Sequence, residues 1–237
     1  MTIGDSGCGW GDLDAAPDPA RLLGFLDEVA ALPAVAAGKR RSCELLAPAR
    51  GDRLLDAGCG TGDDAVALAI DVLPGGEVIG VDASEIAVTT ARARAGDRPG
   101  LSFVRAELTA LPFADGHFAG ARADRVLLHV ERAVFAVHEL LRVTGPGGRL
   151  VITEGRFTGV EWIPGREPPA GATGDVLPAL PLILEHLGAI DIQLERDDSD
   201  VILSEDALAV IGLRSPAARL SVVHITATVG ASRPQRR

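Results

Sequence analysis

Three closely spaced glycines, Gly58, Gly60 and Gly62, separate a short apolar segment predicted to be a strand from a segment predicted to be a helix. Glycines at such a junction allow a tight turn and let a ligand approach the backbone closely. Asp82 ends the next predicted strand, 24 residues after Gly58. An acidic side chain at that place can accept both hydroxyls of a ribose. The spacing therefore indicates a site for a cofactor that carries adenosine.

The charge at the start of the following helix indicates which adenosine cofactor binds. A dinucleotide motif would place its third glycine at position 63, but the chain has Asp63 followed by Asp64. These two carboxylates stabilise the helix through its dipole, and they would repel a pyrophosphate that favours the same helix end. S-adenosylmethionine carries a sulfonium and an ammonium and no phosphate, so the charge pattern favours it over NAD or FAD.

Five segments of the chain resemble, in order and spacing, the motifs of class I S-adenosylmethionine-dependent methyltransferases, especially the small-molecule, type 11-like branch. They read LLDAGCGTGDDAVALA, GEVIGVDAS, LSFVRAELTALPFADGHFA, RVLLHV and ELLRVTGPGGRLVITE. The similarity runs from about Asp18 to Glu154 and is thin beyond residue 155. It implies S-adenosylmethionine as the methyl donor.

The resemblance also implies which residues contact the cofactor. Around the methionine part it places Asp56, Gly58, Gly60, Gly62 and Arg122, and around the adenosine part Asp82, Ala83, Ala106 and Glu107. The chain departs from the family pattern at three places. Glu107 is one methylene longer than the usual aspartate, Ala119 replaces an aspartate that braces the fourth strand, and Thr144-Gly145 replaces a leucine and a basic residue. None of these changes removes a cofactor contact outright.

Methyl transfer from a sulfonium is an in-line displacement, so the enzyme mainly aligns the nucleophile, the methyl carbon and the sulfur. A base is needed only where the nucleophile carries a proton of high pKa. The chain has no Tyr and no Asn, which leaves His, Asp and Glu. His129 is the first choice, because it follows the predicted fourth strand and an ordinary imidazole titrates near neutral pH. The alternative is that His129 only packs or bonds to backbone in its loop.

Other side chains are candidates for contact with the substrate. Arg125 could hold a carboxylate, and Glu154 ends the predicted fifth strand, where a solvated rim carboxylate is the alternative. Two apolar covers carry aromatic residues, the first helix with Phe25 and the segment 155–175 with Trp162. They suggest a small, fairly apolar substrate, although ordinary core packing explains the same residues.

Strand and helix patterns alternate from residue 53 to residue 153, and the strands are continuously apolar, which is typical of a parallel sheet covered on both faces. With the resemblance, this predicts an α/β fold with a Rossmann-like, doubly wound, mostly parallel seven-stranded sheet and an antiparallel C-terminal edge strand. The last two strands, 189–194 and 219–229, are expected to form an edge hairpin. The expected organisation is a flexible N-terminus (1–17), a helical lid (18–50), the methyltransferase domain (51–230, with a variable substrate cover at 155–175) and a disordered tail (231–237).

Composition excludes several classes of function. The single lysine, Lys39, is followed by Arg40, so no P-loop exists and only Lys39 could form a Schiff base. Lys39, Arg40 and Arg41 together are expected to be a solvated helix face. The net charge of −10 argues against a nucleic-acid partner. The chain shows no membrane span, signal peptide or metal-ligand spacing, and its three cysteines suit a reducing cytoplasm.

The expected function is transfer of the methyl group of S-adenosylmethionine to an O, N or C nucleophile of a small metabolite. The Arg bias suggests a bacterium, where such enzymes often tailor secondary metabolites. One alternative is a related fold that binds the cofactor but catalyses a non-methylating reaction such as a cyclisation. Others are a non-enzymatic binding protein and a protein as methyl acceptor. The sequence leaves the oligomeric state open.

Overall fold

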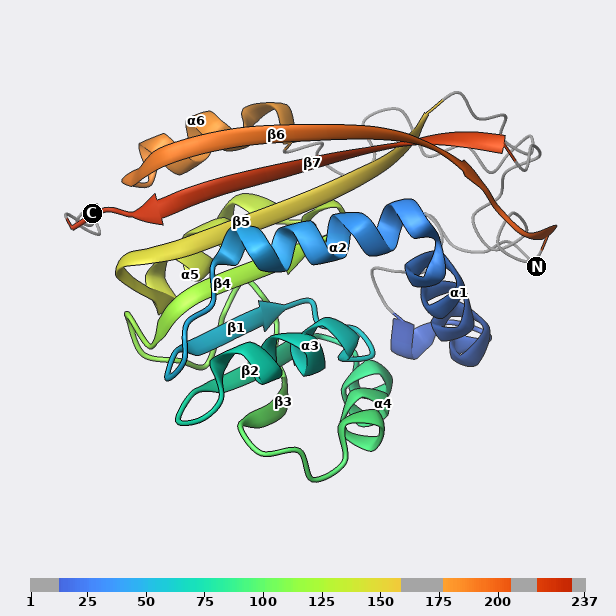
Figure 1. Cartoon of the computed structure of the whole chain (residues 1–237), viewed down its shortest axis with the longest axis horizontal. Helices are drawn as coiled ribbons and strands as arrows, with labels where there is room; N and C mark the ends of the chain where they lie inside the picture. Colours follow the sequence, from blue (N-terminus) through green and yellow to red (C-terminus); the bar gives the residue numbers. More distant parts are fainter. Residues whose placement is uncertain (1–12, 159–176, 206–216, 232–237) are drawn as a thin grey trace.

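The computed structural model describes residues 13–158, 177–205 and 217–231, and its centre is one seven-stranded sheet (Figure 1). The strand order is β3-β2-β1-β4-β5-β7-β6. Strands β1 to β5 are parallel, and β7 is antiparallel to both of its neighbours. The strands are β1 (Arg53–Ala57), β2 (Glu77–Asp82), β3 (Leu101–Arg105), β4 (Phe118–Asp124), β5 (Thr144–Thr158), β6 (Ala189–Ile202) and β7 (Ala217–Val229). The predicted fold class is confirmed.

Helices cover both faces of the sheet. They are α1 (Pro19–Ala31), α2 (Pro33–Leu46), α3 (Asp63–Val72), α4 (Glu85–Ala95), α5 (Ala133–Val143) and α6 (Leu180–His186), with short 3-10 turns η2 (Leu127–His129) and η3 (Leu177–Ala179). Neighbouring strand residues point to opposite faces, so Leu54 packs in the core under α3 and α4, whereas Leu55 packs in the core under α5 and α6. Both side chains are fully buried, which explains why the strands read as continuous apolar runs.

The first helix, α1, begins at a side-chain cap. The side chain of Asp18 accepts a hydrogen bond from the Arg21 N–H, and Pro19 occupies the first turn. Of the segment expected to be flexible, residues 13–17 are described and differ from that expectation. Leu13 is buried, and the Asp14 carboxylate accepts hydrogen bonds from the backbone N–H groups of Glu85 and Ile86 at the start of α4.

The C-terminal hairpin is longer than expected. Strand β6 was expected to end at residue 194 but continues to Ile202, and the hairpin lies at the sheet edge with β6 outermost. The stretch from Glu195 to Asp200 is charged and reads as a loop. An edge strand accepts such side chains because one flank of it faces solvent, and Asp200 pairs there with Arg219 of β7. Pairing with β7 also carries β5 on to Thr158.

The carboxyl ends of the central strands meet at one edge of the sheet. Ala57 of β1 lies level with Val81 of β2 and Ala123 of β4, and Ala123 lies level with Ile152 of β5. In Figure 1 this edge faces α1, at the end where the arrow of β1 points. The loops that follow these strands therefore come together beneath the N-terminal helices.

Candidate functional site

The glycine loop between β1 and α3 contains two kinds of glycine. All three have positive φ, which an L side chain rarely adopts. A Cβ at Gly58 would lie 2.3 Å from a methyl group of Val126, and one at Gly62 would lie 2.8 Å from the Phe103 ring. A Cβ at Gly60 would instead meet only Leu26 of α1, at 3.9 Å. Packing of the chain itself thus requires Gly58 and Gly62, whereas Gly60 borders space that a ligand could occupy.

Asp82 closes the loop from the side of β2. Its two carboxylate oxygens accept hydrogen bonds from the N–H groups of Gly60, at 2.9 Å, and Ser84, at 3.0 Å. Burial raises the pKa of Asp82. The sequence placed Asp82 at the ribose, and this geometry puts its carboxylate directly beside Gly60.

The residues expected at the adenine lie around the end of β2. The backbone N–H of Ala106 donates to the Asp82 carbonyl at 3.0 Å, which joins β3 to this rim. Ala83 and Glu107 are exposed, and the Ala83 carbonyl accepts a hydrogen bond from Arg105. Ala83 and Ala106 therefore lie beside Asp82 at this rim, and Glu107 is the next residue along the chain.

Arg122 is the centre of a buried polar cluster. Its side chain is 1% exposed, and its guanidinium donates to Asp56 and Asp64 at 2.9 Å, to Asp124 at 2.7 Å and to the Ser42 hydroxyl at 2.5 Å. These partners come from β1, α3, β4 and α2. The guanidinium is thus occupied by the protein itself, so Arg122 holds the cluster together beneath the methionine end of the site rather than offering donors to a ligand.

The aspartates of the cluster differ in the direction of their pKa shifts and in whether each oxygen has a hydrogen-bond partner. Burial raises the pKa of Asp56, and Arg122 offsets this only in part. Burial acts in the same direction on Asp64, but Arg122 and Lys39 hold the Asp64 pKa below its usual range. Within the described residues, Asp56 Oδ2 is buried without a hydrogen-bond partner. A buried acceptor in this state is a natural partner for a cationic ligand group.

Lys39 joins this cluster from α2, contrary to the expectation of a solvated face. Its ammonium forms an ion pair with Asp64, and its side chain is 22% exposed. Arg41 pairs with Glu195 and Glu44 while its side chain stays 43% exposed, and Arg40 is exposed, so the expectation is wrong for Lys39 alone. The sequence did not single out Lys39, Ser42 or Asp124 as site residues. The one signal it offered was that the chain has no other lysine.

His129, in the turn η2 after β4, and Glu154, within β5, lie on the same rim. Burial lowers the pKa of His129 to about 4, which corrects the expectation of an imidazole that titrates near neutral pH. Glu154 is 4% exposed and not a solvated rim carboxylate. It accepts a hydrogen bond from the Leu127 N–H at 2.9 Å, and burial raises its pKa to about 8. At pH 7 the imidazole is neutral and the carboxyl is protonated.

Arg125 connects this rim to the buried cluster. Its φ of 53° is left-handed, an uncommon conformation for a side chain of this size. Its N–H donates to the Thr153 carbonyl at 2.6 Å, and its Nε lies 3.0 Å from Asp124. Strained backbone at the carboxyl edge of a sheet is typical of functional sites.

The two expected substrate covers are described in part. Phe25 is buried in α1, and its neighbour Leu26 overhangs Gly60. Trp162 and most of the segment 155–175 lie outside the described residues, as does all but the first residue of the expected tail 231–237. The first cover is therefore placed over the glycine loop.

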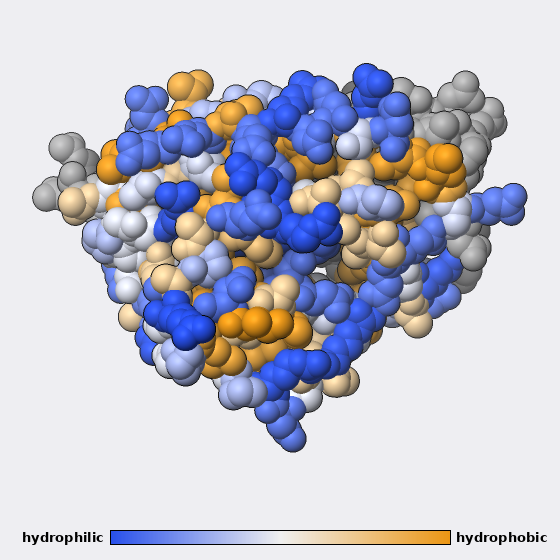
Figure 2. All heavy atoms as spheres, in the orientation of Figure 1, coloured by the Kyte–Doolittle hydropathy of each residue, from blue (hydrophilic) through white to orange (hydrophobic). Residues whose placement is uncertain are grey.

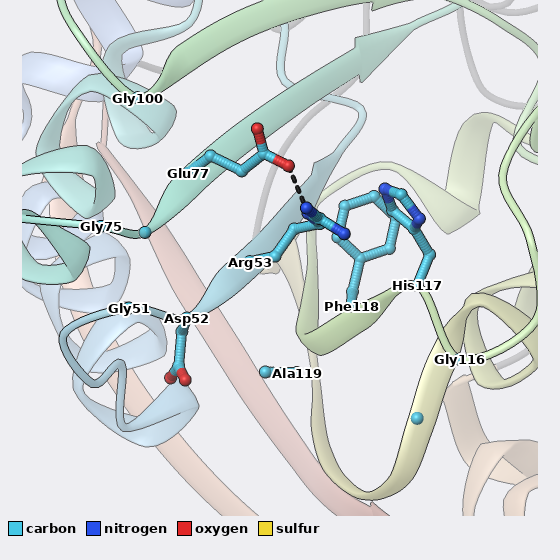
Figure 3. A pocket seen from close by; sticks show the side chains of 12 residues that line it. Gly51, Asp52, Arg53, Gly75, Glu77, Gly100, Gly116, His117, Phe118 and Ala119 are labelled. Carbon is cyan, nitrogen blue, oxygen red and sulfur yellow. Dashed lines mark hydrogen bonds and ion pairs between the residues drawn. The ribbon is translucent and has the colours of Figure 1, made fainter.

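A separate hollow of about 600 Å³ lies at the amino ends of the strands, away from this rim (Figure 3). Its lining includes Asp52, Arg53, Glu77, His117 and Ala119. Arg53 and Glu77 form an ion pair across β1 and β2, with side chains 47% and 40% exposed. In the part of the chain that the structure describes, no three His, Cys, Asp or Glu side chains lie together as metal ligands would, and no helix is long and apolar enough to cross a membrane.

The central part of the chain is similar in sequence to known methyltransferases. Residues 55–152 match the family described as methyltransferase domain. A demethylmenaquinone methyltransferase from Beutenbergia cavernae is 37% identical over 147 residues, which cover 62% of this chain and 58% of that relative. The chain spans between 40% and 58% of the length of the first curated relatives that it matches.

Two solved structures share the fold over most of the chain. The [4+2]-cyclase SpnF has a TM-score of 0.69 at 20% identity, covering 98% of this chain and 100% of its own. The Haemonchus contortus phosphoethanolamine N-methyltransferase 2, solved with phosphomonomethylethanolamine and S-adenosylhomocysteine, has a TM-score of 0.70 at 15% identity and covers 92% of this chain and 59% of its own. The match to the methyltransferase domain is thus confined in sequence to residues 55–152, while the fold is shared over most of the chain.

Proposed function

We propose that the chain transfers the methyl group of S-adenosylmethionine to an O, N or C nucleophile of a small, fairly apolar metabolite. The observation that carries this proposal is the arrangement around Gly60. The space beside it lies under Leu26, with Asp82 at one side. The glycine loop then leads into α3, where Asp64 joins the cluster of Asp56, Lys39 and Arg122. A ribose suits the first side, and a charged amino-acid group suits the second.

The residues proposed to hold the cofactor form two groups, one for the adenosine and one for the methionine part. Asp82, Ala83, Ala106 and Glu107 would hold adenosine, while Asp56 and the glycine loop would hold the methionine part, with Arg122 as the support beneath. The bound cofactor supplies a methyl carbon on a cationic sulfur, which leaves as a neutral thioether. The chain's own contribution is alignment, since an in-line displacement depends mainly on placement of the nucleophile.

Three residues are proposed to face the substrate: Arg125 and His129, which follow β4, and Glu154, which lies in β5. His129 is the candidate proton acceptor, but a pKa of about 4 makes it a weak base, so it suits a nucleophile whose own proton is acidic. Glu154 is protonated at pH 7 and can donate its O–H to a substrate oxygen. Arg125 remains the candidate for holding a substrate carboxylate. Phe25 and Trp162 are proposed to cover the substrate from the helical lid, residues 18–50, and from the segment 155–175.

The proposed setting is the bacterial cytoplasm, with secondary metabolism as the pathway class. The net charge of −10 supports a small-molecule partner over a nucleic acid. The relative named demethylmenaquinone methyltransferase makes an aromatic hydroquinone a reasonable first acceptor to test.

The experiment has a binding arm and a transfer arm. The binding arm titrates the full chain with S-adenosylhomocysteine in a calorimeter, and a wild-type chain without binding would show the proposal to be wrong. The transfer arm incubates the chain with radiolabelled S-adenosylmethionine and a panel of acceptors, beginning with 1,4-dihydroxynaphthalene kept reduced. Label should move to an organic-soluble product. Asp82→Ala should weaken cofactor binding by about tenfold or more, because a buried hydrogen-bonding group is lost.

A cyclisation is the second candidate, because SpnF matches the chain over nearly its whole length. In that case the chain binds the cofactor, and a substrate is converted without any label moving to it. Mass spectrometry distinguishes the two reactions, since methylation adds about 14 mass units and cyclisation adds none.

A further inference from the structure

Lys39 is the only lysine of the chain, which otherwise carries 22 arginines among its 23 basic residues. It lies on α2, where strongly hydrophilic atoms gather on the face shown in Figure 2. Its ammonium nevertheless turns to Asp64 on the first turn of α3, directly after the glycine loop. A lone lysine at this position is not explained by the family match, which begins at residue 55.

Lys39, Asp64 and Arg125 are the outermost members of the charged cluster. Their side chains are 22%, 15% and 24% exposed, whereas Arg122, Asp56 and Asp124 below them are 1% to 3% exposed. A ligand that enters beside the glycine loop therefore meets Lys39 and Asp64 first.

The other cations of the cluster are committed to the protein. Arg122 donates to Ser42 and to three carboxylates. Arg125 has its Nε 3.0 Å from Asp124. Lys39 presents three N–H donors, and within the described residues its only hydrogen bond is to Asp64. On the acidic side, Asp56 Oδ2 and Asp124 Oδ1 are buried acceptors without a hydrogen-bond partner in the described chain.

We propose that Lys39 binds the α-carboxylate of the cofactor's methionine part, while the carboxylates of Asp56 and Asp64 receive its α-ammonium. This inference rests on the proposed function, because it assumes that S-adenosylmethionine occupies the site. The cofactor's amino acid is a zwitterion, and the Lys39–Asp64 pair with Asp56 beside it is a complementary pair of opposite charges. Lys39 thereby selects cofactors that carry an amino-acid end over those that carry only the thioadenosine.

The test compares two ligands that differ only in that end. S-adenosylhomocysteine has the amino acid, and 5′-methylthioadenosine lacks it. Calorimetry on the full chain should show that Lys39→Met lowers the affinity for S-adenosylhomocysteine by about 10- to 100-fold, as expected for loss of a charge-assisted hydrogen bond. The affinity for 5′-methylthioadenosine should change by less than about twofold. Lys39→Arg should retain most of the affinity. Arg40→Met, an exposed neighbour, is the matched control and should change neither ligand.

A second measurement uses the wild-type chain and so does not depend on a variant that folds. With one lysine present, an amine-reactive acetylating reagent labels only Lys39 and the N-terminal amine. Saturating S-adenosylhomocysteine should slow acetylation of Lys39 by about tenfold or more and leave the N-terminal amine unchanged, because the ligand's carboxylate would cover the Lys39 amine.

The outcomes separate this inference from the proposed function. A wild-type chain that binds neither ligand overturns both. If S-adenosylhomocysteine binds but Lys39→Met leaves its affinity unchanged, or weakens both ligands equally, the assignment of Lys39 is wrong and the proposed function stands. Equal acetylation rates with and without S-adenosylhomocysteine overturn the assignment in the same way.

Discussion

The two ends of the sheet carry ion pairs of opposite kinds. At the carboxyl end, Arg122 and its three aspartates are almost completely removed from solvent. At the amino end, Arg53 and Glu77 pair across the rim of the hollow, with side chains close to half exposed. The end with the open hollow is thus not the end at which we propose that the cofactor binds. Buried charge is costly and persists only where the surroundings compensate it, so it marks function better than volume does.

Removal of Arg122 should have the largest effect on this contrast. Arg122→Met leaves Asp56, Asp64 and Asp124 buried without their shared cation, and the loss of one partner from a buried ion pair costs about 3–5 kcal/mol. Urea unfolding followed by circular dichroism measures this. A loss below about 1 kcal/mol would mean that the cluster is hydrated and behaves like a surface pair.

Substitution of two glycines of the loop should have different effects: Gly58→Ala mainly lowers stability, and Gly60→Ala mainly lowers ligand affinity. Gly58→Ala should destabilise the chain by about 2–3 kcal/mol, because the new Cβ overlaps Val126 and φ is 71°. Gly60→Ala should cost only about 1 kcal/mol, the strain of its positive φ, yet weaken S-adenosylhomocysteine clearly. Thermal unfolding and calorimetry on both variants check this. If the two variants lost ligand affinity in the same proportion to their loss of stability, this expected difference would be wrong.

Glu154 should make the carboxyl end sensitive to pH. Its pKa is about 8 in the folded chain against an ordinary 4.5, so the folded state retains a proton that the unfolded state loses between these values. Its contribution to stability is complete below pH 4.5 and falls as the pH rises to about 8. Glu154→Gln removes this dependence and should be more stable than wild type by about 4 kcal/mol at pH 8, with little difference at pH 4.5. Urea unfolding at both pH values measures the difference, and parallel curves for the two proteins would show that Glu154 titrates normally.

Disruption of the amino-end pair should have the smallest effect. Arg53→Met removes an exposed ion pair, which is worth about 0–1 kcal/mol, and should leave S-adenosylhomocysteine affinity unchanged. The same unfolding and binding measurements serve as the control for the Arg122 variant. A tenfold loss of affinity would show that the hollow is coupled to the cofactor site.

Sequence reasoning was most successful where a function depends on neighbours along the chain. The glycine loop, Asp82 at the end of β2 and the alternation of strands and helices are all local patterns, and they predicted the fold and the cofactor. It was wrong about the length of β6, because charged residues in a strand are acceptable only at a sheet edge, and position in the sheet is not a local property. It was wrong about the pKa of His129, since burial depends on what packs above the residue.

Residue type and spacing by themselves determined that this chain builds a parallel sheet with a glycine loop suited to a cationic adenosine cofactor. Only the tertiary structure decided which charges meet. Lys39, Asp56, Asp64 and Arg122 are separated by up to 83 positions in the sequence. They converge because β1 and β4 end at one edge of the sheet, α3 begins there, and Lys39 reaches it from the middle of α2. Electrostatic energy depends on distance and burial, which the folded chain sets, and composition shows only that the charges exist.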